Sequence, residues 1–173
     1  VPMYVKGLQD AGVQATVKHF PGHGDTKEDS HSGYASSYKN LEELRQCELI
    51  PFQTGISTDV SFVMVGHISL PNVLNSQTPA SLSSVIVHDL LREELGFNGV
   101  IITDALNMGA ISENYTSQEA VISAVKAGAD MLLMPSDFIN SYAALRNAVY
   151  EGEISEQRIN ESVKRIIQIK NKL

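Results

Sequence analysis

The sequence predicts an α/β fold of the (β/α)8 TIM-type barrel class, of which the chain supplies about the last four β/α units, a half-barrel. Three observations predict it. Short runs rich in apolar and β-branched residues recur along the chain, segments with helical patterning separate them, and polar residues stand where the runs end.

The apolar runs are expected to be buried strands, because uninterrupted apolar stretches of this length are typical of parallel sheets. A parallel strand needs a crossover, usually a helix, to bring the chain back. Regular alternation of the two leaves a closed barrel or a doubly wound open sheet. The expected strands are residues 15–20, 62–67, 100–104 and 131–134, and the expected helices are residues 41–54, 82–95, 118–127, 140–150 and 156–173.

Polar residues at the strand ends favour the barrel. Lys18, His19, His67 and Asp104 each stand at the end of an expected strand. A (β/α)8 barrel gathers its active site at the carboxyl ends of its strands. We therefore prefer the barrel to the doubly wound sheet.

The expected helix boundaries carry capping signals. Ser81 is expected to cap the helix over residues 82–95, and Thr116 with Glu119 has the spacing of a capping box. Gly128 is expected to end the helix that Thr116 begins.

Length and composition indicate one globular domain over residues 1–173. The chain has 173 residues, of which 43% are hydrophobic and 19% are charged. A complete barrel of this class typically needs about 250 residues and eight strands, so we expect this domain to be the C-terminal half of a barrel. The strands at its two edges would lack partners, which predicts a homo-oligomer or dependence on a missing N-terminal half.

Charge and hydropathy exclude several partners. The net charge is −7 and no run of Lys and Arg forms a basic patch, so nucleic acid is not expected as a partner. No apolar run approaches the roughly 20 residues that span a bilayer, so no membrane span is expected. The single cysteine, Cys47, is expected to be a buried or half-buried thiol.

The densest polar stretch follows the first expected strand. It reads KHFPGHG over residues 18–24, and Asp29 and His31 follow shortly after. Pro and Gly break regular structure there, so the histidines are displayed on a loop. In an extended loop, side chains two residues apart point to the same side, so Asp29 would fix the tautomer of His31. An imidazole titrates near neutrality and suits general acid and base work.

Asp104 supplies the complementary chemistry. Taken singly, an Asp in this position caps the following turn and a strand-end His is a structural hydrogen-bonding residue. Together, Asp104 as a carboxylate that attacks carbon and His31 as a proton shuttle would supply the two groups that a retaining glycosidase needs. Such enzymes normally use two carboxylates, so the pair of Asp29 and His31 would replace one. Lys18 and His19 would hold substrate hydroxyls.

Two motifs carry a family resemblance. KHFPGHGDTKEDSH, followed about 70 residues later by GVIITDAL, resembles the β-N-acetylhexosaminidase branch of glycoside hydrolase family 3. The resemblance implies that Asp104 is the nucleophile, that His31 is the acid/base and that Asp29 orients it. It also implies that Lys18 and His19 bind the sugar, and that no cofactor or metal is needed.

The resemblance further implies the reaction. Family members of this branch release a non-reducing terminal N-acetylglucosamine from glycans such as muropeptides or chitin fragments, through a covalent glycosyl-enzyme intermediate. The complete family barrel also holds the sugar with an upstream arginine and aspartate, which this chain does not contain, so we expect the isolated chain to lack part of the sugar site. Phosphate in place of water as the second acceptor stays open, because a neutral histidine repels an anion less than a carboxylate does.

Two alternatives come from other classes. A metal-dependent barrel hydrolase would use His19, His31, His67 and Asp104 as ligands, although no H-E-x-x-H or H-x-H spacing is present. A non-catalytic half-barrel would bind a sugar or only assemble. Metal analysis separates the first from a glycosidase, and turnover separates the second.

Overall fold

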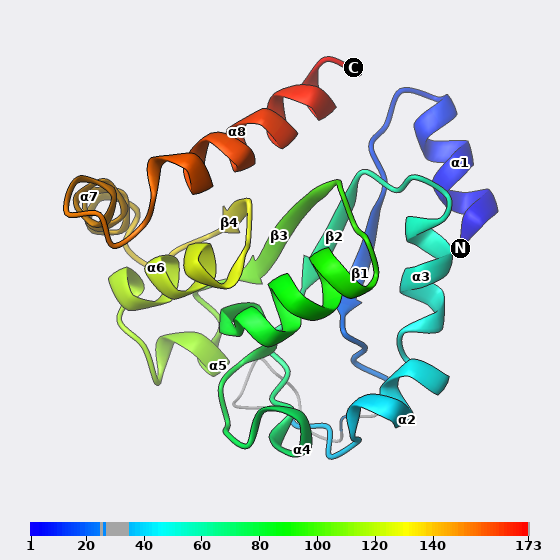
Figure 1. Cartoon of the computed structure of the whole chain (residues 1–173), viewed down its shortest axis with the longest axis horizontal. Coiled ribbons are helices and arrows are strands. Elements are labelled where there is room, and N and C mark those ends of the chain that lie inside the picture. The colour runs from blue at the N-terminus through cyan, green and yellow to red at the C-terminus, as the bar shows by residue number, and fades with distance from the viewer. Residues whose placement is uncertain (25, 27–34, 173) are drawn as a thin grey trace.

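A computed structural model describes residues 1–24, 26 and 35–172 of the chain. Helices and strands alternate along it (Figure 1). The elements are α1 (Pro2–Asp10), β1 (Thr16–Phe20), α2 (Leu41–Gln46), α3 (Ile50–Ile56), β2 (Phe62–Val65), α4 (Pro71–Leu74), η1 (Ala80–Leu82), η2 (Val85–Glu94), β3 (Val100–Ala105), α5 (Gly109–Ser112), α6 (Ser117–Ala127), β4 (Met131–Leu133), α7 (Phe138–Tyr150) and α8 (Glu156–Lys170).

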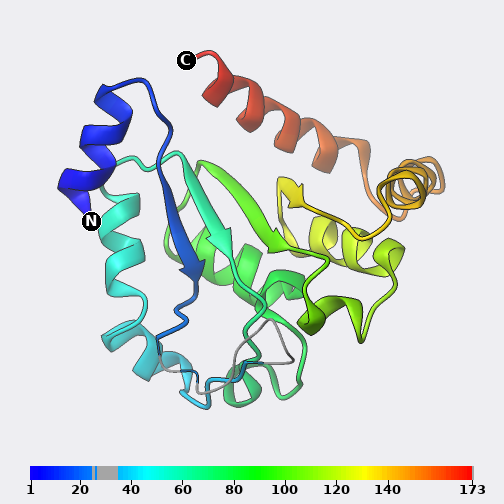
Figure 2. The ribbon, with the colours of Figure 1, turned by 180° about the vertical axis from the view of Figure 1, so that it is seen from behind.

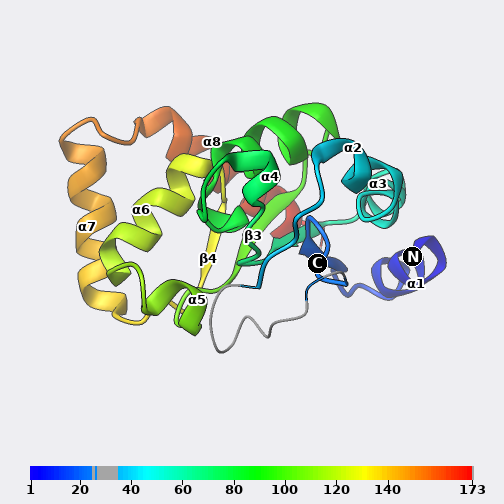
Figure 3. The same ribbon diagram turned by 90° about the horizontal axis from the view of Figure 1, so that it is seen from below.

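The strands form one parallel sheet in the order β1-β2-β3-β4, so each strand pairs with the next one along the chain. Seen from behind, one face of the sheet is turned to the viewer and η2 lies beyond it (Figure 2). Seen from below, α3, α4, α6 and α7 form an arc outside the strands (Figure 3). This arrangement confirms the predicted α/β class and matches part of a barrel. The barrel is not closed, because β1 and β4 are the outer strands of the described sheet.

Burial alternates along the central strands. Val63, Val65 and Ile101 face the helices and are at most 1% exposed, whereas Met64 and Ile102 are only partly buried. The predicted burial of these strands is therefore complete on the side of the helices and partial on the other. Helices cover only one side of the sheet within the described residues, so Met64 and Ile102 keep some contact with solvent, whereas Val100 at the start of β3 is fully buried.

The main core lies between the sheet and the helices. The rings of Phe20 and Phe52 meet edge to face, with 5.1 Å between their centroids. Burying aromatic and aliphatic side chains together in this way supplies most of the stabilisation of such a layer. The other large buried side chains of this cluster include Leu44, Val63, Ile68, Leu70, Ile86, Leu91, Phe97 and Ile101.

The helix predicted over residues 41–54 is two helices, α2 and α3. Pro51 lies in the first turn of α3, where its missing N–H costs nothing, but in a continuous helix its ring would clash with the carbonyl of Cys47. The chain breaks at Cys47 for this reason. The thiol is exposed in the break, so its predicted burial was wrong.

Thr116 and Glu119 form the predicted capping box of α6, and Gly128 ends that helix with φ 120°. The prediction for Ser81 was wrong. Ser81 lies in η1, is fully buried and contacts His67 instead of capping. The following helix, η2, begins after Ser84 and has i→i+5 hydrogen bonding at its end.

A buried carboxylate joins the amino-terminal end of the sheet to α8. The Asp130 side chain is 0% exposed and lies 2.7 Å from Arg92 and 3.1 Å from Arg165. It also accepts hydrogen bonds from Ser162 Oγ at 2.6 Å and from the Ile101 N–H at 3.0 Å. Burial lowers the pKa of Arg92 to about 10, so its guanidinium stays charged at neutral pH.

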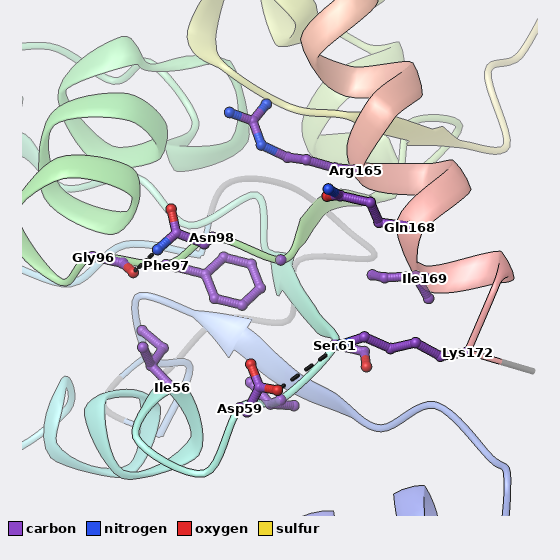
Figure 4. Close-up of a pocket in the computed structure, with 12 residues that line it drawn as sticks. Ile56, Asp59, Ser61, Gly96, Phe97, Asn98, Arg165, Gln168, Ile169 and Lys172 are labelled. Carbon is purple, nitrogen blue, oxygen red and sulfur yellow. Dashed lines mark hydrogen bonds and ion pairs between the residues drawn. The ribbon is translucent and has the colours of Figure 1, made fainter.

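A cavity of about 490 Å³ lies at this same end of the sheet (Figure 4). Phe97 and Ile169 line it, together with Arg165 of α8 and Lys172, which follows that helix. Because Ser61 immediately precedes β2, the cavity lies at the amino-terminal ends of the strands. Asp104, the described residue predicted to react, does not line it. No helix among the described residues is long and apolar enough to cross a membrane.

Candidate active site

Asp104 lies near the carboxyl end of β3, and its side chain is 18% exposed. Its Oδ1 atom accepts a hydrogen bond of 2.8 Å from the N–H of Ala105. Its Oδ2 atom faces Nε2 of His19 at 3.5 Å. One oxygen is thus tied to the backbone, and the other is directed toward the end of a different strand.

His19 comes from β1, two strands away in the sheet. The peptide bond between Lys18 and His19 is cis, and the pairing of β1 with β2 shifts register in this stretch. Burial lowers the pKa of His19; Asp104 opposes this shift, and Lys18 and His23 add to it. The imidazole is therefore neutral at neutral pH and presents one N–H donor.

Two glycines shape the surroundings of His19. The N–H of Gly22 donates to the His19 carbonyl at 2.8 Å and closes a turn, in which Gly22 has φ 132°. A Cβ atom on Gly22 would lie 2.7 Å from Cβ and Cγ of Glu48, and one on Gly66 would lie 3.1 Å from Cβ of His19. At Gly22 both the backbone angle and the close approach require glycine, whereas a Cβ at Gly66 would need the His19 side chain to shift by a few tenths of an ångström.

The Glu48 side chain packs against this turn at Gly22. Its side chain is 10% exposed, and its Oε1 lies 2.5 Å from Nζ of Lys39. The other oxygen, Oε2, is buried and has no hydrogen-bond partner among the described residues. The sequence gives no signal for the burial of Glu48, because a lone Glu in a helical stretch is usually exposed.

Lys18 is exposed on β1, beside His19. It lines a cavity of about 680 Å³ together with His19 and His23. The His19 and His23 rings meet edge to face at 5.9 Å, and Nδ1 of His23 lies 2.8 Å from Oγ1 of Thr26. The structure thus keeps the residues of the KHFPGHG stretch together at one edge of the sheet.

Asp29 and His31, the predicted proton shuttle, lie outside the described residues. The described chain resumes at Ala35, whose carbonyl accepts a 2.8 Å hydrogen bond from the N–H of Ser69. Ser37 donates to the Ser69 carbonyl at 3.0 Å. The chain that follows the predicted shuttle is therefore tied to the segment after β2.

His67 is not placed as a metal ligand. It is 1% exposed, and its two ring nitrogens contact Ser81 Oγ at 2.7 Å and the Ala105 carbonyl at 3.0 Å. Within residues 1–24, 26 and 35–172, no three His, Cys, Asp or Glu side chains gather as a metal site would require. The contact between His67 and Ser81 was missed, since Ser81 was interpreted as a helix cap.

The fold and the site together define a class. A parallel α/β sheet with helices on its outer side presents a carboxylate and a neutral imidazole at the carboxyl ends of its strands, which is where barrel enzymes hold their reacting groups. Comparison with known proteins gives the family. The family model described as "Glycosyl hydrolase family 3 N terminal domain" matches residues 1–169. The chain therefore belongs to glycoside hydrolase family 3.

Several relatives resemble nearly the whole chain. Beta-hexosaminidase A of Pseudoalteromonas piscicida is 36% identical over 189 aligned residues, covering 98% of this chain and 32% of the relative. The β-N-acetylglucosaminidase structure from Paenibacillus sp. str. FPU-7 is 45% identical with a TM-score of 0.95, over 99% of this chain and 33% of that one. A structure named beta-glucoside phosphorylase BglX is 29% identical with a TM-score of 0.92, over 99% of this chain and 32% of that one. The chain spans about a third of the length of each.

Proposed function

We propose that the chain carries the chemical groups of a retaining β-N-acetylglucosaminidase, with Asp104 as the nucleophile. The observation that carries the proposal is the division of labour between the two oxygens of Asp104. Oδ1 is held by the Ala105 N–H, and Oδ2 faces His19 across the carboxyl edge of the sheet. A carboxylate fixed through one oxygen keeps the other aimed at an electrophilic carbon.

The other roles follow the resemblance. His31, oriented by Asp29, gives a proton to the leaving oxygen while Oδ2 of Asp104 bonds to the anomeric carbon. The same histidine then takes a proton from the water that releases the sugar, so one group serves both steps. Lys18 and His19 bind sugar hydroxyls, which is supported by the contact of His19 with Asp104 and by the position of both residues along the cavity next to β1.

The proposed substrate is a glycan that ends in β-linked N-acetylglucosamine, such as a muropeptide or a chitin fragment. Support comes from the relatives, which are named beta-hexosaminidase and beta-N-acetylglucosaminidase.

The decisive test uses Asp104→Gly, assayed with azide and an activated aryl N-acetyl-β-glucosaminide in the protein expressed at its full natural length. One displacement inverts the anomeric centre and two displacements retain it. Loss of the nucleophile leaves one displacement by azide, so we expect recovery of turnover with an α-glycosyl azide as product. His31→Gly is the matched control and should give the β-azide. A β-azide from Asp104→Gly, or undiminished turnover without azide, would refute the assignment.

A second candidate reaction transfers the sugar to phosphate instead of water. The resemblance to a structure named as a phosphorylase favours testing it. Turnover would be measured in phosphate and in a zwitterionic buffer at equal ionic strength. Appearance of a sugar 1-phosphate, together with faster turnover in phosphate, would establish phosphorolysis; free sugar alone in both buffers would establish hydrolysis.

We also propose that residues 1–173 act as the C-terminal half of a barrel whose outer strands pair with further strands, either from a second copy or from further sequence. Support comes from the outer positions of β1 and β4 in the described sheet. Sedimentation of the isolated chain tests whether its outer strands pair with a second copy. Comparing the turnover of the isolated chain with that of the protein at full natural length tests whether they pair with further sequence. A monomeric chain with full activity would contradict both.

A further inference from the structure

The most enclosed titratable group near Asp104 is His67, which follows β2. It is 1% exposed, and both of its ring nitrogens are engaged. Nδ1 lies 2.7 Å from Oγ of Ser81, and Nε2 lies 3.0 Å from the carbonyl oxygen of Ala105. The proposed reaction gives this histidine no role in bond making or proton transfer.

These contacts fix one tautomer. A carbonyl oxygen only accepts hydrogen bonds, so Nε2 must carry the proton that it shares with Ala105. A neutral ring then leaves Nδ1 as an acceptor, and the hydroxyl of Ser81 donates to it. Burial lowers the pKa of His67 and keeps the ring neutral, although Asp104 opposes this shift.

Ala105 links this histidine to the nucleophile. Its carbonyl accepts from His67 at 3.0 Å, and its N–H donates to Oδ1 of Asp104 at 2.8 Å. His67 thus holds Ala105 through the carbonyl of Ala105, and Ala105 holds the Asp104 carboxylate through its own N–H. The line of contacts runs from Ser81 through His67 and Ala105 to Asp104.

We propose that His67 is a positioning residue for the nucleophile: as a neutral ring protonated on Nε2, it anchors the Ala105 carbonyl and so fixes the direction of Oδ2 of Asp104. The inference rests on the proposed function of Asp104. Displacing a reacting group by about 1 Å costs on the order of 100-fold in rate. Loss of this anchor therefore lowers the rate of the first chemical step and leaves sugar binding largely intact.

Substitutions at His67 test the anchor in the protein at its full natural length. His67→Gln keeps an N–H donor near the place of Nε2, whereas His67→Leu removes it. We expect kcat of the Leu variant to fall on the order of 100-fold with KM within about threefold, and the Gln variant to recover most of the loss. The deficit in kcat/KM, which reports the first chemical step, should be equal for 4-nitrophenyl and 2,4-dinitrophenyl N-acetyl-β-glucosaminides, because nucleophile alignment does not depend on protonating the leaving group.

Three outcomes would overturn the inference. These are a folded Leu variant with unchanged kcat, a deficit that vanishes with the dinitrophenyl leaving group, and a Gln variant as slow as the Leu variant. A second measurement needs no variant: long-range ¹H–¹⁵N correlation in the wild-type protein should show His67 protonated on Nε2 alone at neutral pH. An Nδ1–H tautomer or a charged ring there would refute the anchor even if the Leu variant does not fold.

Failure of this inference is distinguishable from failure of the proposed function. If Asp104→Gly turns over undiminished without azide, Asp104 is not the nucleophile and the proposed function fails. If Asp104→Gly behaves as expected and His67→Leu is fully active, only the positioning role fails.

Discussion

Nε2 of His19 lies 3.5 Å from Oδ2 of Asp104, although the two residues come from strands separated in the sheet by β2. Parallel strands bring their carboxyl ends to one edge, so residues that are 85 positions apart in the chain become neighbours there. The contact places a neutral imidazole beside the oxygen proposed to attack the sugar.

Replacing His19 tests the value of this contact. His19→Ala removes the donor, and we expect kcat/KM for an aryl N-acetyl-β-glucosaminide to fall by about 10- to 100-fold, the range for a hydrogen bond to a charged group. His19→Gln restores an N–H at similar reach and should recover part of the loss. Steady-state kinetics at full natural length measure this, and equal kcat/KM for the Ala variant and the wild type would contradict a role in binding.

Acid should destabilise the fold through its buried histidines. The pKa values of His19 and His67 are both lowered by burial. Below about pH 6.5, the unfolded chain therefore binds more protons than the folded chain, and the free energy of unfolding falls as the pH falls. Each histidine contributes a slope of at most about 1.4 kcal/mol per pH unit.

The histidine part of this slope is measured by urea unfolding at several pH values for the wild type and for His67→Gln. The glutamine does not titrate. As the pH falls below about 6.5, the free energy of unfolding of the variant should therefore decrease less than that of the wild type. Carboxylates titrate in both proteins and cancel in the difference. Identical slopes would show that His67 does not resist protonation.

Gly22→Ala should destabilise the turn at the site. The added Cβ would lie 2.7 Å from the Glu48 side chain. The alanine would also have to adopt the backbone angle φ 132°, and such strain costs about 1–3 kcal/mol of stability. The matched control is Gly24→Ala, because a Cβ there meets nothing within 4 Å. Thermal unfolding of both variants checks the prediction, which fails if they lose the same stability.

Asp130→Asn should be strongly destabilising. The substitution removes the buried negative charge beside Arg92 and Arg165, and breaking a buried pair from one side costs about 3–5 kcal/mol. Glu153→Gln removes a charge from the exposed pair with Lys126 at 3.2 Å and should cost less than about 1 kcal/mol. Denaturant unfolding would contradict the prediction if the two variants were equally stable.

The sheet could be predicted because its signals are local. Each strand is a short apolar run between helical segments, and the capping box at Thr116 depends on two residues three positions apart. The break in the helix over residues 41–54 was also a local signal, given by Pro51, and it was overlooked.

The site could be predicted in part. The strand-end positions of His19 and Asp104 follow from the order of strands, which is why both were expected at one edge. The contact between Ser81 and His67 could not be predicted, because it joins η1 to the segment after β2 across 14 residues and competes with a plausible helix cap. The burial of Glu48 beneath Gly22 likewise depends on packing that no local pattern encodes.

The sequential order of the sheet bears on how the molecule forms. Every strand pairs with the strand that follows it, so a chain emerging from the ribosome adds each strand to an edge that is already present. His19 and Asp104 come from β1 and β3, so both strands leave the ribosome ahead of α6, α7 and α8. The contact between the proposed reacting carboxylate and His19 therefore joins elements that emerge before the last described helices.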